Sequence, residues 1–80
     1  MDDRARVCEQ IFEAYGADGL EHLLTMFRAS APVNTIASEY GVHRVTVWRW
    51  RKLLGDSRYE PHPEVLLKLR GWRDHGRQAI

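Results

Sequence analysis

The stretch that decides the fold covers residues 33–52 and reads VNTIASEYGVHRVTVWRWRK. Apolar residues recur at helical spacing on both sides of Gly41, a residue that adopts the positive φ of a tight turn without steric cost. Ala37 is small enough to lie where two crossing helices approach closely. The apolar residues expected to close the contact between the helices are Ile36, Tyr40, Val42, Val47 and Trp50. The stretch therefore predicts a short helix, a glycine turn and a second helix over residues 43–54.

Two amphipathic helices are expected ahead of this stretch. The first covers residues 4–15 and ends at Gly16, which offers the left-handed conformation that commonly stops a helix. Its apolar stripe consists of Val7, Ile11 and Tyr15, with Cys8 and Phe12 beside them. The second covers residues 19–29, and its apolar stripe consists of Leu20, Leu23, Leu24 and Phe27. Together they are expected to form a platform in residues 1–31 for the unit in residues 32–55.

The end of the chain is expected to form a loop and a last helix. Asp56, Pro61 and Pro63 are turn-forming signals that predict a loop over residues 56–63. A basic helix within residues 62–78 begins near Pro63. Its expected inward residues are Val65, Leu66, Leu69 and Trp72. Its expected outward residues are Lys68, Arg70, Arg73 and Arg77. The sequence thus predicts a single small all-α domain of about five helices.

Length and composition limit the class of protein. Residues 1–80 are enough for one compact domain, and three Trp, three Tyr and two Phe argue against a disordered tail. The single cysteine, Cys8, cannot form an internal disulfide, which fits a reducing compartment. No apolar run approaches the roughly 20 residues that span a bilayer, and the acidic start is unlike a signal peptide. We therefore expect a cytoplasmic protein with no membrane partner.

The net charge of +1 conceals an asymmetry between the two halves of the chain. Residues 1–40 hold three basic residues against seven acids, a net charge of −4. Residues 41–80 hold nine basic residues against four acids, a net charge of +5. A basic half joined to an acidic half indicates a polyanionic partner for the basic half.

The expected helix over residues 43–54 presents a basic and partly aromatic face to solvent. Arg44 and Arg49 are expected to reach base edges, because a guanidinium group bonds to guanine O6 and N7 in the DNA major groove. Val45 and Trp48 would make apolar contact with thymine methyl groups. Thr46, Arg51 and Lys52 are expected to contact phosphates. His43, at the start of the helix, is expected to reach either a phosphate or a base.

Four short motifs within this stretch carry a resemblance to a known family. They are Ile36-Ala37, Tyr40-Gly41-Val42, Thr46-Val47 and Arg49-Trp50. With them the stretch resembles the helix-turn-helix superfamily of bacterial and phage DNA-binding proteins, although His43 stands where that superfamily usually places a Ser or Asp cap. The proline-bearing loop and basic last helix are also similar to the stage III sporulation protein D family. The resemblance implies sequence-specific binding to double-stranded DNA, in a transcriptional regulator associated with the nucleoid.

Two other functions remain open. Similar segments occur in the DNA-recognition modules of packaging and recombination machines. A helix-turn-helix also serves as a protein-binding adaptor or inhibitor, in which Trp48 would anchor the partner. An enzyme is not expected, because no nucleophile, base and orienting group occur together. No metal site is expected, because the four His residues lack paired spacing with one another or with Cys8. No cofactor or small-molecule ligand is expected either.

Two expectations concern the rest of the surface. The cations of the last helix form either further phosphate contacts or a solvated face, and they are Lys68, Arg70, Arg73 and Arg77. Residues 1–31 carry more apolar side chains than one small unit must cover. A homodimer formed through them would present two copies of the helix over residues 43–54 to half-sites about 34 Å apart.

Overall fold

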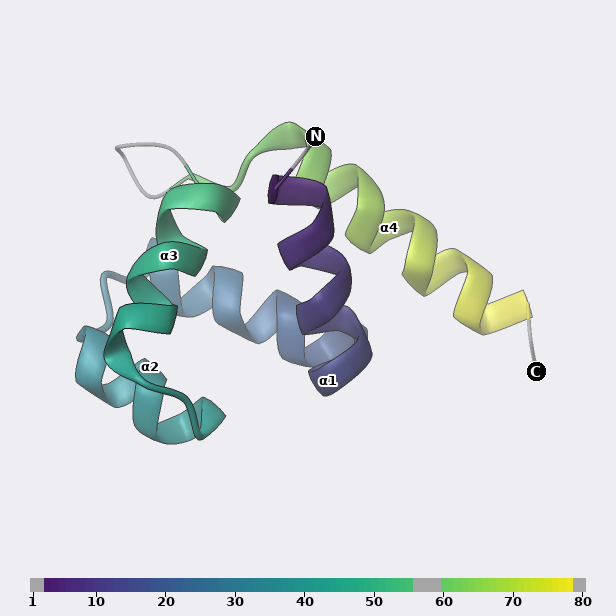
Figure 1. Cartoon of the computed structure of the whole chain (residues 1–80). Helices are drawn as coiled ribbons and strands as arrows, with labels where there is room; N and C mark the ends of the chain where they lie inside the picture. The colour runs from purple at the N-terminus through teal and green to yellow at the C-terminus, as the bar shows by residue number, and fades with distance from the viewer. Residues whose placement is uncertain (1–2, 56–59, 79–80) are drawn as a thin grey trace.

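The computed structural model describes residues 3–55 and 60–78, and the side chains of these residues up to residue 74 (Figure 1). The described part of the chain is all-helical and contains no strand beyond a single bridge between Gly55 and Pro61. Its four helices are α1 (Asp3–Arg28), α2 (Val33–Tyr40), α3 (Arg44–Leu54) and α4 (Pro63–Gln78). Helix α1 packs against both α3 and α4, and its first half stands between them in Figure 1.

The first helix differs from the expected pair of helices. Residues 3–28 form one element, and Gly16 bends it with a backbone φ of 76° and ψ of 179°. Gly16 leaves the helical conformation at the position where the first helix was expected to end, and two helical stretches meet there at a kink. Because these two stretches form the single element α1, the described chain has four helices where about five were expected. The kink brings Gly19 so close to Tyr15 that a Cβ at Gly19 would clash with the Cβ of Tyr15.

The core is formed by one face of each helix. Most of the residues expected in the stripes of α1, α2 and α3 are buried, which confirms the helical spacing read from the sequence, and Phe12, Tyr15 and Val42 are partly buried. Cys8 is fully buried, and this burial raises the pKa of its thiol to about 11, so the thiol stays protonated at neutral pH. The buried residues are Val7, Cys8, Ile11, Leu20, Leu23, Leu24, Phe27, Ile36, Ala37, Tyr40, Val47, Trp50, Leu54, Val65 and Leu69.

The connection between α2 and α3 is a tight turn centred on Gly41. Gly41 has a φ of 65° and a ψ of 34°, the left-handed conformation expected of it. The Val42 N–H donates to the Ala37 carbonyl at 3.0 Å, and the Gly41 N–H donates to the Ser38 carbonyl at 3.4 Å. This is the Schellman arrangement, which satisfies the last carbonyls of a helix and fixes the direction in which the chain leaves it.

Helix α4 packs against α1 through a narrower stripe than expected. Val65 and Leu69 are buried, and the Trp72 ring stacks on Phe12 with 4.2 Å between the ring centroids. The expectation that Leu66 points inward is wrong, because 47% of this residue is exposed. Leu66 lies one residue around the helix from the stripe, where α1 no longer covers it. Residues 56–59 of the expected loop lie outside the described residues.

Candidate nucleic-acid interface

Helix α3 begins with a histidine cap. His43 has an extended backbone, and its Nδ1 accepts a hydrogen bond from the Val45 N–H at 3.2 Å. The imidazole thereby does what a Ser or Asp side chain does at most helix starts. Because Nδ1 is the acceptor, the neutral ring carries its proton on Nε2, which is left as a donor on an exposed residue.

The exposed face of α3 is basic and apolar, without a single acid. Val47, Trp50 and Leu54 point into the core, so the opposite face is turned to solvent. At about 100° per residue, Val45 and Lys52 lie along the middle of this face. The exposed side chains that the structure brings together here are Arg44, Val45, Trp48, Arg49 and Lys52. Val45 is 63% exposed and Trp48 is 55% exposed.

The two remaining candidate residues of α3 lie at the flanks of this face. Thr46 is half-buried on the side that faces α1. Arg51 is half-buried on the other side, and its guanidinium lies 5.6 Å from the centroid of the Trp48 ring. A cation held over an indole face is attracted by the ring, which limits the conformations of Trp48 although that side chain is exposed.

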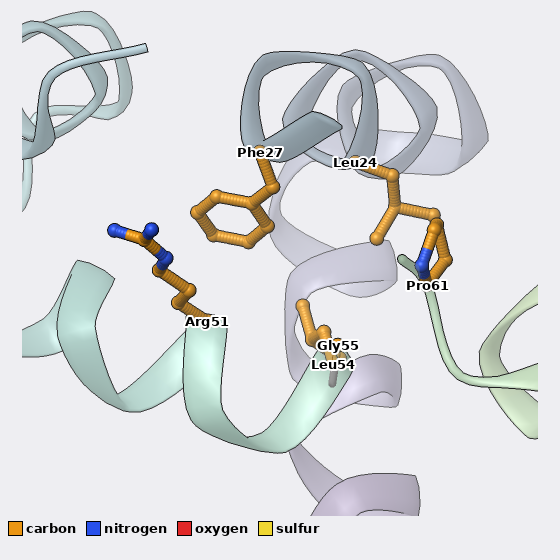
Figure 2. Close-up of a pocket in the computed structure, with 6 residues that line it drawn as sticks. All are labelled: Leu24, Phe27, Arg51, Leu54, Gly55 and Pro61. Atoms are coloured by element: carbon orange, nitrogen blue, oxygen red, sulfur yellow. The ribbon is translucent and has the colours of Figure 1, made fainter. Parts of the chain in front are cut away.

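Figure 2 shows the small apolar pocket beside Arg51. Its volume is about 10 Å³, which is close to the least that holds one water molecule. The pocket joins the end of α3 to the end of α1, and it is lined by Leu24, Phe27, Arg51, Leu54, Gly55 and Pro61. The pocket is a small gap in the packing between α1 and α3.

An aromatic cluster fixes α2 and α3 on α1. The Tyr15, Tyr40 and Trp50 rings meet edge to face, with the Tyr15 and Tyr40 centroids 4.9 Å apart. The Tyr15 hydroxyl donates to the Tyr40 carbonyl at 2.9 Å, and the Tyr40 hydroxyl donates to the Gly19 carbonyl at 2.6 Å. Burial raises the pKa of Tyr40 to about 12, with smaller contributions from Glu39 and Tyr15, so this hydroxyl remains a donor at neutral pH.

The C-terminal end of α3 is also tied to α1. The Arg4 Nε–H donates to the Leu53 carbonyl at 2.7 Å, across 49 residues of sequence. A cation at the carbonyl end of a helix is favourable because the last carbonyls lack helical partners. Both ends of α3 are therefore fixed by side chains, and its outer face is carried on a rigid support.

The candidate cations of α4 divide into two groups. Lys68 pairs with Glu9 at 3.7 Å and lies 5.8 Å from the Trp72 ring centroid. Arg73 pairs with Asp18 at 2.8 Å and also with Glu21. Lys68 and Arg73 are thus paired with acids of α1, although both were expected on the outward side of the last helix. Arg70 is exposed, and the side chain of Arg77 lies outside the described residues.

A polar groove beside α3 contains two residues that sequence reasoning missed. It lies between α1 and α3, has a volume of about 200 Å³, and is lined by Arg6, Val7, Gln10, Thr46, Arg49 and Trp50. The four-residue spacing of Arg6 and Gln10 places them on one face of a helix. Nothing in that spacing indicates that the face lies beside α3. The sequence therefore places Arg6 and Gln10 together but does not show that they lie near the residues of α3.

The apolar residues that suggested a homodimer are used inside the chain. Leu23, Leu24 and Phe27 are buried in the core, and Met26 is partly buried against it. Phe12 stacks on Trp72. The surface that prompted the dimer expectation is therefore covered by the chain's own helices, and the homodimer stays a prediction.

Comparison of the chain with protein-family models, with curated proteins and with solved structures found no match. Within residues 3–55 and 60–78, none of the helices combines the length and the apolar character needed to cross a membrane. The same residues contain no group of three His, Cys, Asp or Glu side chains placed to hold a metal ion. The functional inference therefore rests on the face of α3 and its surroundings.

Proposed function

We propose that this protein binds double-stranded DNA sequence-specifically, with α2, the Gly41 turn and α3 acting as a helix-turn-helix. The observation that carries the proposal is the exposed face of α3, which combines Arg44, Arg49 and Lys52 with Val45 and Trp48 and contains no acid. A helix in the DNA major groove must offer donors to base edges, apolar groups to thymine methyls and cations to phosphates. This one face offers all three.

The support beneath α3 strengthens the proposal. A recognition helix reads sequence only if its side chains are held in register with the base pairs. The Tyr15–Tyr40–Trp50 cluster, the Arg4–Leu53 bond and the Schellman turn provide that constraint.

The roles on α3 follow from position. Arg44 and Arg49 contact base edges, and Val45 and Trp48 contact thymine methyls. Lys52, one turn beyond Trp48, is assigned to a phosphate. The other phosphate contacts are assigned to His43, Thr46 and Arg51. We place the protein among transcriptional regulators of bacterial or phage type that act at the nucleoid.

Selection of bound sequences from a random duplex pool tests this proposal. Enrichment of one defined sequence, with binding that weakens steeply as salt rises, is the expected result. Palindromic winners would indicate a dimer on half-sites about 34 Å apart. Binding without any enriched sequence, or binding that ignores salt, would contradict the proposal. Preference for DNA ends or repeats would instead favour a recognition module of a packaging or recombination machine.

A second candidate function is a protein-binding adaptor or inhibitor. The observation that favours it is the pair of exposed apolar side chains on α3, Val45 and Trp48. Exposed aromatic residues commonly anchor protein interfaces. An absence of salt-dependent binding to duplex DNA at low ionic strength would favour this alternative.

A further inference from the structure

The polar groove between α1 and α3 has the composition of an anion site. Arg6 and Gln10 come from α1, and Thr46 and Arg49 come from α3. These side chains provide guanidinium, amide and hydroxyl donors, and no acid lines the groove. Its volume of about 200 Å³ is more than ten times the roughly 10–15 Å³ that one water molecule needs, so a group of several heavy atoms fits.

Arg6 is available to such an anion. Its guanidinium pairs with Asp3 at 3.2 Å, and both side chains are more than half exposed. Exposed pairs of this kind contribute little and are easily exchanged for another anion. Gln10 lies one turn further along α1 and is also exposed.

The groove adjoins the proposed recognition face. Arg49 belongs to both surfaces, and Thr46 lies at the edge of α3 that faces α1. When a helix lies in the major groove, its two edges face the two sugar-phosphate backbones, and the N-terminal part of its outer face meets the bases. The α1 edge of α3 is therefore where a backbone strand would pass.

We propose that this groove binds one backbone phosphate of duplex DNA, held by Arg6 and Gln10 of α1 together with the Thr46 hydroxyl of α3. The inference rests on the proposed DNA-binding function and adds α1 to the interface. A guanidinium bound to a phosphate oxygen makes a charge-assisted hydrogen bond, and an amide and a hydroxyl complete the set of donors. The contact would fix how deeply α3 enters the major groove, since it joins a second helix to the same backbone.

The test measures binding to a short random-sequence duplex over a range of salt concentrations. Arg6→Gln is expected to weaken binding about tenfold at low salt, because a charge-assisted bond is lost. The slope of log K against log salt should fall in magnitude by about 0.9, the value for one phosphate on B-DNA. Arg6→Lys keeps the charge and should keep the slope. Gln10→Ala should weaken binding about threefold without a change of slope.

Arg28→Gln is the matched control. Arg28 is on the same helix, is 60% exposed against 58% for Arg6, and pairs with one carboxylate, that of Glu60, at 3.3 Å. It lies away from the groove, so its substitution should leave the slope unchanged although it removes the same charge. Circular dichroism and thermal melting establish that each variant folds.

The outcomes separate the two proposals. If the unmodified protein binds duplex DNA with a steep salt dependence but Arg6→Gln keeps its slope, the groove proposal fails and the recognition face stands. Equal slope losses for Arg6→Gln and Arg28→Gln would assign the effect to net charge and also overturn the groove proposal. If the unmodified protein shows no salt-dependent binding to duplex DNA, both proposals fail.

Discussion

The imidazole of His43 holds the start of α3 by accepting a hydrogen bond from the Val45 N–H. Helix starts expose backbone donors that need partners, and Ser, Thr, Asp and Asn usually provide them. The sequence indicated that His43 occupies the cap position but not that a ring nitrogen would fill the role. The structure adds that the same residue can cap the helix and still offer its other nitrogen to a ligand.

His43→Ala should therefore destabilise the protein by about 1 kcal/mol, because the Val45 N–H loses its partner. His43→Ser should recover most of that loss, since a Ser hydroxyl accepts the same kind of bond. Denaturant unfolding of the three proteins measures the difference. Equal stability of His43→Ala and the unmodified protein would show that the cap contributes nothing.

Tyr40 is expected to make the stability of the protein depend on pH. Its pKa rises from 10.0 to about 12, chiefly because of burial, so the folded protein holds this proton more tightly than the unfolded chain does. The resulting stabilisation is complete below pH 10 and is lost as the pH rises from 10 towards 12. Tyr40→Phe should lose about 1–2 kcal/mol at neutral pH, because the Gly19 carbonyl loses its donor.

Comparison of the unmodified protein with Tyr40→Phe isolates the contribution of the Tyr40 hydroxyl to the pH dependence of stability. The free energy of unfolding should fall more steeply between pH 10 and 12 in the unmodified protein than in Tyr40→Phe. Cys8 titrates in both proteins, so its contribution cancels. Parallel pH profiles would contradict the assignment to Tyr40.

At the scale of elements, α3 has a buried apolar face that packs in the core and an exposed face of basic and apolar side chains. Its face was predicted from spacing alone, because Val47, Trp50 and Leu54 define the buried side and therefore the exposed side. The structure confirms which residues are exposed, while their contacts with DNA stay a proposal.

Substitutions on this face should separate specificity from general affinity. Arg49→Ala should cost about 1–3 kcal/mol on the selected sequence and much less on random duplex, because a base contact is lost. Lys52→Ala should weaken binding to both duplexes alike and reduce the salt slope by about 1. Titrations of both variants against both duplexes measure this. Equal losses for Arg49→Ala on the two duplexes would contradict its role at a base.

The turn between α2 and α3 and the middle of α4 form a matched pair of glycines. Neither Gly41 nor Gly71 has an atom within 4 Å of an added Cβ, so space is not the difference between them. Gly41 has a φ of 65°, whereas Gly71 lies inside α4. Gly41→Ala should cost about 1–2 kcal/mol and Gly71→Ala should add about 0.5–1 kcal/mol. Thermal unfolding tests the opposite signs, and a destabilising Gly71→Ala would contradict this account.

At the scale of the whole molecule, α1 packs against two separate parts of the fold, which are α4 on one side and the pair of α2 and α3 on the other. Its acids hold Lys68 and Arg73 of α4, and its tyrosine supports α2 and α3. The charge asymmetry of the sequence is thus partly neutralised inside the fold. Three of the six exposed cations of the described residues lie on α3, where they are proposed to meet DNA.

Trp72→Ala tests this division. It should lower stability by about 2 kcal/mol, because the half-buried Trp72 ring and its stacking on Phe12 are lost. Affinity for duplex DNA, measured well below the melting temperature, should stay unchanged, because α3 and α4 lie on opposite sides of the first half of α1 (Figure 1). A large loss of affinity in the folded variant would mean that α4 takes part in binding.

The sequence by itself determined the features that depend on neighbours along the chain. Helical spacing defined the buried stripes, Gly41 marked the turn, and Pro63 marked the start of α4, because these signals act within one or two helical turns. The same reasoning placed the basic and apolar residues of α3 on one exposed face.

Only the tertiary structure decided what depends on distances between helices. It showed that the two helical stretches on either side of Gly16 meet at a kink within α1, that Leu66 is about half exposed, and that Lys68 and Arg73 are paired with acids of α1. It also brought Arg6 and Thr46, which are 40 positions apart in the sequence, to the lining of one groove. Spacing within one helix fixes which side chains share a face, but the angle and position at which two helices pack decide which faces meet.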